Sequence, residues 1–405
     1  MTGQPQNPFA NLPTSGQLQV GGQGGGANPP SGSGDRRAIN RFTKLEFSGT
    51  AMDLFGIKLI NIILIAVTVG IWIPWARVRN RRFFYNNTRI LDDGLDYLAT
   101  GFDLFKGWVV VTIILLAFYA LPMLGVPFLQ EGLSVLLLLV YPWALNKSLR
   151  FNARNLAWRD VRFDFHGSYL GSLWNFFLFP VIGILTLGLL LPMASRSMRD
   201  YIASRYSFGT ASFFSESSLG AYYGAGLKTL LLFLALFFPL MILLISTAAG
   251  AIIDGVSYAG EGNDSSNLAL AVLNILMVQI HPLAFPLTLG FIFMVTGAYY
   301  RALTRNIMLG SLRLKGGVRF RSTVSGLVLA WIVVTNLLLV IVSVGLLLPW
   351  AQVRQYKYLT ENTEIRPITE LTGFIDRQSR AGHSVGDAVG EAGDKCFNIK
   401  WISVG

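Results

Sequence analysis

The sequence predicts an all-α, polytopic membrane protein, and three observations support this prediction. Apolar residues make up 52% of the chain and charged residues only 14%, well below the roughly one quarter that is typical of soluble domains. Several apolar runs reach the roughly 20 residues that a helix needs to cross a bilayer core. A nine-residue pattern, hydroxyl-x-Gly-x-x-x-Pro-(Trp/Met)-Ala, closes three of these runs.

The pattern covers residues 68–76, 186–194 and 343–351, and basic residues follow each copy at once. A longer match accompanies it, because Val-Arg-Phe at 161–163 returns at 318–320 with the offset that separates the second and third copies. Three copies of this length predict an internal repeat. Duplicated halves occur in transporters and in proteins without transport activity, so the repeat does not indicate a function.

We expect four firm transmembrane spans and three repeat segments that either span the membrane or re-enter it, giving up to seven membrane segments. The spans are residues 108–124, 129–145, 227–253 and 268–300; the repeat segments are about 52–76, 169–194 and 326–351. The expected organisation is a disordered Gly/Pro/Ser tail (1–34), a first repeat with a polar linker (35–106), two hairpin-plus-repeat units (107–225 and 226–363) and a polar C-terminal tail (364–405).

The charge pattern leaves the path of the repeat segments open. Loops 122–131 and 251–267 carry no Lys or Arg, so the positive-inside rule places both outside the cytoplasm. Each repeat segment, however, has basic residues on both flanks. A spanning helix needs ends on opposite sides, whereas a re-entrant hairpin bent at the Gly and the Pro returns to the same side. Re-entry would also place both chain termini in the cytoplasm.

The composition argues against several function classes. One cysteine, Cys396, cannot form an intrachain disulfide or a thiolate metal cluster. Paired carboxylates, nucleophile–base sets and the familiar metal or phosphate motifs are not found in the sequence, so we expect no enzymatic activity, no cofactor and no metal. The net charge of +11 comes from Lys and Arg at the ends of apolar runs, which favours membrane lipids as partners over nucleic acid.

Three polar residues lie within apolar segments and are candidates for a polar path. Asn61 and Asn336 each stand 13 residues before a motif proline, and His281 interrupts the last long apolar run. Intramembrane polar groups are candidates for function. The simpler interpretation is that the amides form hydrogen bonds in helix packing and that the lone histidine is structural.

The arginines that follow the motif prolines have two compatible interpretations. They hold the cytoplasmic ends of the segments, and they can contact anionic lipid head groups at about 1 kcal/mol each near a charged leaflet. The candidate head-group contacts are Arg77, Arg79, Arg196, Arg199 and Arg354.

The motif copies, with Phe47-Ser48-Gly49 upstream and Asn87-Thr88 downstream, resemble those of the YjgN family of bacterial inner-membrane proteins, whose domain has no known function. The resemblance covers about residues 44–363, and Asn362-Thr363 repeats the downstream pair. The second copy departs from the pattern at Met193. The resemblance implies a multi-pass inner-membrane location, and it implies no substrate, cofactor or catalytic residue.

Two functions remain open for this integral inner-membrane protein. The first is a transporter or channel for a small solute, suggested by duplication and by Gly/Pro-broken segments. The alternative is a lipid-interacting membrane scaffold or assembly partner, suggested by the repeated basic and aromatic segment ends. The substrate, protein partners and oligomeric state do not follow from the sequence.

His281 provides a first test. If its role is structural, His281→Gln keeps a hydrogen-bonding group, so the variant should purify as a folded protein with an unchanged helical circular-dichroism spectrum. A folded variant that has lost a pH-dependent solute flux in proteoliposomes would instead assign a proton-linked role to this residue.

Overall fold

The computed structural model describes residues 40–125, 128–260, 265–368, 373–375 and 377–378. Within these ranges it does not describe the side chains at 122, 124, 247–248, 251–260 and 265–283. The predicted disordered tail and most of the predicted C-terminal tail lie outside the described residues, as does the side chain of His281.

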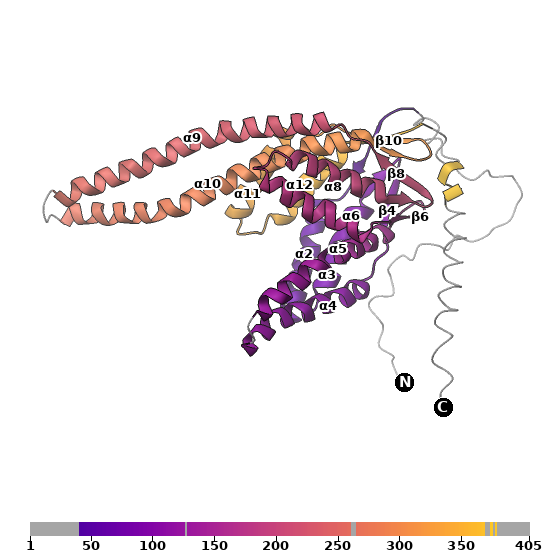
Figure 1. Ribbon diagram of the computed structural model, residues 1–405, viewed down its shortest axis with the longest axis horizontal. Helices are drawn as coiled ribbons and strands as arrows, with labels where there is room; N and C mark the ends of the chain where they lie inside the picture. Colours follow the sequence, from indigo (N-terminus) through magenta and orange to yellow (C-terminus); the bar gives the residue numbers. More distant parts are fainter. Residues whose placement is uncertain (1–39, 126–127, 261–264, 369–372, 376, 379–405) are drawn as a thin grey trace, which may run out of the picture. The chain divides into compact units, whose positions relative to one another are not determined.

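Short antiparallel strands build one eleven-stranded sheet (Figure 1). Their order is β1-β11-β10-β9-β8-β7-β6-β5-β4-β3-β2, so nearly every strand pairs with its neighbour in the chain. The strands are β1 (Thr43–Lys44), β2 (Glu46–Phe47), β3 (Thr88–Ile90), β4 (Asp93–Tyr97), β5 (Leu156–Trp158), β6 (Val161–Phe165), β7 (Tyr206–Phe208), β8 (Ala211–Ser215), β9 (Leu312–Leu314), β10 (Val318–Ser322) and β11 (Thr363–Pro367).

The sheet closes on itself through its first two strands. β1 pairs with β11, β2 pairs with β3, and Leu45 alone separates β1 from β2. The backbone N–H of Leu45 donates to the carbonyl of Thr363 (2.9 Å), which continues the ladder across this junction. The first and last described strands therefore lie side by side, with Thr43 opposite Ile365.

The chain leaves the sheet in a helix and returns in a helix five times within the described residues. Hydroxyl side chains cap several outgoing helices, as Thr50 and Thr100 do by accepting from the N–H three residues later. Figure 1 shows the two longest helices, α9 and α10, side by side. The helices are α2 (Ala51–Val67), α3 (Ile73–Asn86), α4 (Gly101–Ala120), η1 (Leu121–Leu124), α5 (Leu129–Arg154), α6 (Tyr169–Leu173), the π-helical η2 (Trp174–Leu178), α7 (Phe179–Leu185), α8 (Leu191–Arg205), α9 (Leu219–Gly260), α10 (Ser265–Ser311), α11 (Gly326–Val342) and α12 (Leu348–Glu361).

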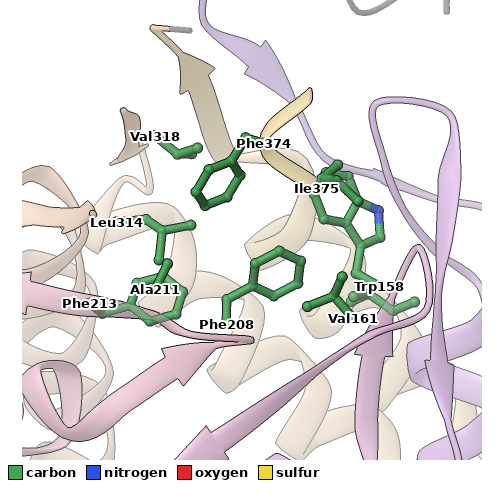
Figure 2. Close-up of a cluster of buried hydrophobic side chains, with 10 residues drawn as sticks. Trp158, Val161, Phe208, Ala211, Phe213, Leu314, Val318, Phe374 and Ile375 are labelled. Carbon is green, nitrogen blue, oxygen red and sulfur yellow. The ribbon is translucent and has the colours of Figure 1, made fainter. Parts of the chain in front are cut away.

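The largest buried apolar cluster joins the strands to a segment near the C-terminus. Figure 2 shows Phe374 and Ile375 among side chains from the strands, including Trp158 and Phe208. Gln378 continues this contact, because its side-chain oxygen accepts from the backbone N–H and the hydroxyl of Thr210 (2.7 and 2.6 Å). Residues well beyond β11 therefore belong to the core of the sheet.

The three motif segments form the same turn between an outgoing and a return helix. Thr68 Oγ1 donates to the carbonyl of Leu64 (2.7 Å) and accepts from the N–H of Trp72 (3.1 Å). Ser343 makes the equivalent pair of contacts, and Thr186 accepts from the equivalent N–H but donates to the carbonyl three residues back, that of Gly183. We call α2/α3, α6–α8 and α11/α12 the first, second and third motif hairpins.

The glycine and the proline of the motif have separate roles in this turn. Gly70, Gly188 and Gly345 adopt φ of 88°, 87° and 88°, a left-handed region that suits glycine. The proline then lies in the first turn of the return helix, where an N–H would have no partner within the helix. The motif therefore encodes a reversal of the chain direction.

The prediction of an all-α fold is wrong, because the polar linkers between the apolar segments form the sheet. Each strand has two to five residues, too few for an alternating pattern to stand out from a polar loop. The Val-Arg-Phe segments at 161–163 and 318–320 lie in β6 and β10.

The prediction of up to seven membrane segments is also corrected. Three helices in the described residues are long and apolar enough to cross a membrane: Gly101–Ala120, Leu129–Arg154 and the Leu219–Ser246 part of α9. The expected span at 268–300 lies in α10, whose side chains are only partly described. The outgoing helix of the third motif hairpin has 17 residues, short of the roughly 20 needed to span a bilayer. Both basic flanks of each motif segment adjoin the sheet, because the segment turns back.

The closed sheet predicts which positions share one side of the membrane. In a Cys396→Ser background, single cysteines at Ser48, Ser212 and Lys315 should resist an impermeant thiol reagent in spheroplasts until the membrane is opened, because all three lie in or beside the sheet and basic flanks stay inside. Met123→Cys, in η1 between two candidate spans, should label from outside. Labelling of any sheet position from outside would contradict this arrangement.

Candidate functional site

The first and third motif hairpins contain a buried amide that faces an arginine. In the first, Arg79 Nη1 of α3 donates to Asn61 Oδ1 of α2 (3.5 Å). The Asn61 side chain is buried, and the Arg79 guanidinium also lies over the ring of Trp72, 5.3 Å from its centroid. The pair joins the outgoing helix to the return helix.

The third hairpin repeats this arrangement with more contacts. Arg354 Nη1 donates to Asn336 Oδ1 (3.3 Å) and to Thr335 Oγ1 (2.7 Å). Asn336 Nδ2 donates to the carbonyl of Ala351 (3.0 Å), and Arg354 lies over the ring of Trp350 at 5.3 Å. Both amides therefore bond an arginine within their own hairpins, and no hydrogen bond among the described residues joins Asn61 to Asn336.

The second motif hairpin has a different interior. The position five residues after the motif proline, Arg79 and Arg354 in the other copies, is Ser197. Ser197 Oγ donates to the Oδ1 of Asn175 (2.5 Å), and Asn175 Nδ2 donates to the carbonyl of Gly171 (2.8 Å). Asn175 lies in the π-helical segment η2, and such segments are frequent at functional sites.

A pocket of about 370 Å³ opens where the shorter serine replaces arginine. Its walls come from η2, α7 and α8 and from the end of β8, and they combine an ion pair, hydroxyls and apolar side chains. The lining residues are Asn175, Phe179, Met193, Arg196, Ser197, Asp200, Tyr201, Ser204 and Ser215.

Charge in the pocket comes from Arg196 and Asp200. Arg196 Nε lies 3.4 Å from Asp200 Oδ2, and this buried nitrogen makes no hydrogen bond within the part of the chain that the structure describes. Asp200 already accepts from the hydroxyls of Ser215 and Ser217 at 2.8 to 2.9 Å. The carboxylate is thus held by two serines, and the guanidinium retains donors for a ligand.

The family of this chain follows from comparison with known proteins. A family model described as "Bacterial protein of unknown function (DUF898)" matches residues 42–392. The chain belongs to this family. The match includes the whole sheet and the second-hairpin pocket.

Curated relatives carry the name "Inner membrane protein YjgN". The relative from Salmonella typhimurium is 27% identical over 351 residues, covering 80% of this chain and 88% of the relative. The relatives from Escherichia coli O157:H7 and K12 are each 28% identical over 142 residues, covering 35% of this chain and 36% of theirs. No solved structure matches the chain. The resemblance to the YjgN family is therefore confirmed.

The arginines expected to contact head groups have different environments. Arg77 is exposed on α3, and Arg79 and Arg354 bond the buried amides. Arg196 lines the pocket, whereas Arg199 is partly buried on the same helix and does not line it.

The sequence-based reasoning missed Asn175, Ser197 and Asp200 as site residues. A usable signal was present, because the second copy alone lacks both the amide 13 residues before the motif proline and the arginine five residues after it.

The amide–guanidinium pair of the third hairpin can be measured by a double-mutant cycle. Asn336→Ala and Arg354→Met should each destabilise the protein in detergent. Their direct hydrogen bond should give a coupling energy of roughly 0.5–3 kcal/mol in denaturant unfolding. Val342→Ala, an 83% exposed position on the same helix, should combine additively with Arg354→Met. Additive behaviour of the Asn336 and Arg354 changes would show that the pair contributes nothing to stability.

Proposed function

We propose that this protein is a non-enzymatic, lipid-interacting protein of the bacterial inner membrane, and that the second-hairpin pocket binds the phosphate-bearing head group of a lipid. The observation that supports the proposal is the difference between hairpins that share one turn. An arginine bonds the buried amide in the first and third, while the shorter Ser197 lines a polar pocket in the second.

The chemistry of the pocket suits a phosphate ester. Arg196 offers guanidinium donors, which pair well with phosphate oxygens. Asn175 and Ser197 add neutral polar groups. Asp200 balances the charge of Arg196, so a zwitterionic head group could place its phosphate at Arg196 and its ammonium group at Asp200.

Apolar surface adjoins this polar pocket. Phe179 and Met193 line it, and Leu189, in the motif turn of the same hairpin, is 73% exposed. Large exposed apolar side chains are favourable where acyl chains cover them. A lipid could therefore keep its chains on the hairpin surface while its head group enters the pocket.

The alternative function, a transporter or channel, receives no support from the described residues. Two of the three side chains expected to line a polar path, Asn61 and Asn336, bond arginines inside separate hairpins. The third, His281, lies outside the described side chains. A multi-pass arrangement remains part of the proposal, with α4, α5 and α9 as the candidate crossings.

Lipid retention tests the proposal. Ser197→Arg copies the first and third hairpins and should fill the pocket, while Arg196→Gln removes its cation. Native mass spectrometry of purified protein should show roughly tenfold less retained phospholipid for each variant, because a charge-assisted hydrogen bond contributes about 1.5–3 kcal/mol.

The matched control is Lys147→Gln, which removes an exposed cation from the C-terminal half of α5. Its phospholipid retention should equal that of the parent protein. Equal loss in Arg196→Gln and Lys147→Gln, which each remove one positive charge, would indicate a general charge effect. Unchanged retention in folded Ser197→Arg protein would rule out the pocket as the lipid site.

A further inference from the structure

A row of basic and aromatic side chains crosses the sheet from β8 to the start of β1. Strand register places Phe214 of β8 opposite Arg313 of β9. Arg319 of β10 stands opposite both Arg313 and Arg366 of β11. Phe42, which directly precedes β1, ends the row, because the Arg366 guanidinium lies 5.5 Å from its ring centroid. We call these five residues the arginine row.

The arginine row lies on the exposed face of the sheet. Successive side chains of a strand point to opposite faces, and burial alternates accordingly along β9 and β10. Arg313 and Arg319 are exposed, whereas Leu314 and Val318 beside them are buried in the apolar cluster. The guanidinium groups of these strands therefore face away from the core.

The arginine row contains no acidic residue, unlike the row next to it. In that second row, Glu364 of β11 stands opposite both Arg321 of β10 and Lys44 of β1. Arg321 Nε lies 3.8 Å from Glu364 Oε2. By contrast, Arg313 and Arg319 form no ion pair within the part of the chain that the structure describes. Like charges directly opposite each other are destabilising on a sheet, so an anion bound along the row would be stabilising.

The internal repeat provides a comparison for this cluster. Arg319 belongs to the Val-Arg-Phe segment at 318–320, and Arg162 is its equivalent in the segment at 161–163. Arg162 is also exposed, but it stands opposite Ala157 of β5, and its carbonyl accepts from the N–H of Gly209 on the other side (3.0 Å). The arginine that has no cationic neighbour across the strands in one copy is therefore the centre of a cluster in the other.

The chemistry and shape of the arginine row favour a flexible chain of phosphates that carries bases. Guanidinium groups pair with phosphate oxygens, and the rings of Phe42 and Phe214, 38% and 42% exposed, are surfaces on which bases can stack. With strands about 4.8 Å apart, the path from Phe214 to Arg366 is about 14 Å long. Because a closed sheet curves, a flexible strand can follow this path, whereas a flat membrane surface meets only part of it.

We infer that the arginine row binds single-stranded nucleic acid, with its three arginines on the phosphates and its two phenylalanines against the bases. The site is separate from the second-hairpin pocket, which no residue of the row lines, so it does not depend on lipid binding there. The sequence alone favours lipids over nucleic acid because the row is spread over residues 42 to 366. Strand pairing brings its members together.

Fluorescence anisotropy of the full-length protein in nonionic detergent tests the inference, with a fluorescein-labelled oligothymidylate of about twelve residues as the probe. Binding should be saturable, and the logarithm of the association constant should fall with that of the salt concentration with a slope of about −2, or about 0.7 for each of three phosphate contacts. Arg313→Gln and Arg319→Gln should each weaken binding and make the slope shallower by about 0.7. Phe214→Ala should weaken binding by roughly fivefold or more and leave the slope unchanged, because stacking involves no charge.

The matched control is Arg162→Gln, which removes the equivalent exposed arginine outside the row and should bind the probe as the parent does. Without probe, Arg319→Gln should melt no lower than the parent, because the change relieves repulsion across the strands. If Arg319→Gln does not fold, Arg319→Lys replaces it; lysine keeps the charge but not the paired donors, so this variant should keep the slope and bind more weakly.

Four results would overturn the inference. The first is the absence of saturable probe binding, and the second is an equal loss in Arg162→Gln. The third is equally tight binding of fluorescein-labelled oligoglutamate, which would indicate a general attraction for acidic chains. The fourth comes from protein in nanodiscs: loss of probe binding in anionic lipid, with binding kept in zwitterionic lipid, would assign the row to the membrane surface. We expect binding in both kinds of nanodisc.

Discussion

The backbone ladder that closes the sheet is the constraint on which the rest of the described structure depends. Strands of two to five residues have little stability alone and need neighbours on both sides. Pairing of β1 with β11 and of β2 with β3 supplies the missing neighbours and leaves no long open edge. Each helix pair between two strands therefore begins and ends at the closed sheet. As a result, the chain returns to the sheet after every helix pair.

One turn motif then serves three hairpins with different interiors. The hydroxyl, glycine and proline satisfy backbone groups and set the reversal, and they leave the facing side chains free to vary. An amide–arginine pair links the two helices of the first and third hairpins, whereas Asn175, Ser197 and the π-helical segment accompany a pocket in the second. The three hairpins therefore differ in the side chains between their two helices, although the turn that joins the helices is the same.

The cations of the chain divide according to their partners. Exposed ones such as Arg77 suit a charged membrane surface, and Arg79, Arg81 and Arg354 act as hydrogen-bond donors between elements. Arg305 also donates between elements, to Thr363 of β11 and Leu359 of α12. Arg199 is partly buried and has no acidic partner in the described residues. In the sequence, all of these arginines are simply basic residues that follow apolar runs. Only their surroundings in the structure show which of them face the membrane surface and which bond other parts of the chain.

By itself, the sequence determined the membrane character, the family and the three copies of the motif, because composition and short motifs are read directly from the residues. It left open whether each motif segment spans the membrane or turns back. It did not determine the sheet, whose strands are too short to show a period and pair across up to about 320 residues, as Thr43 does with Ile365. Nor did it reveal the pocket, although the departure at Ser197 was visible. A missing side chain becomes a cavity only where neighbouring helices do not close over it, and tertiary packing alone decides that.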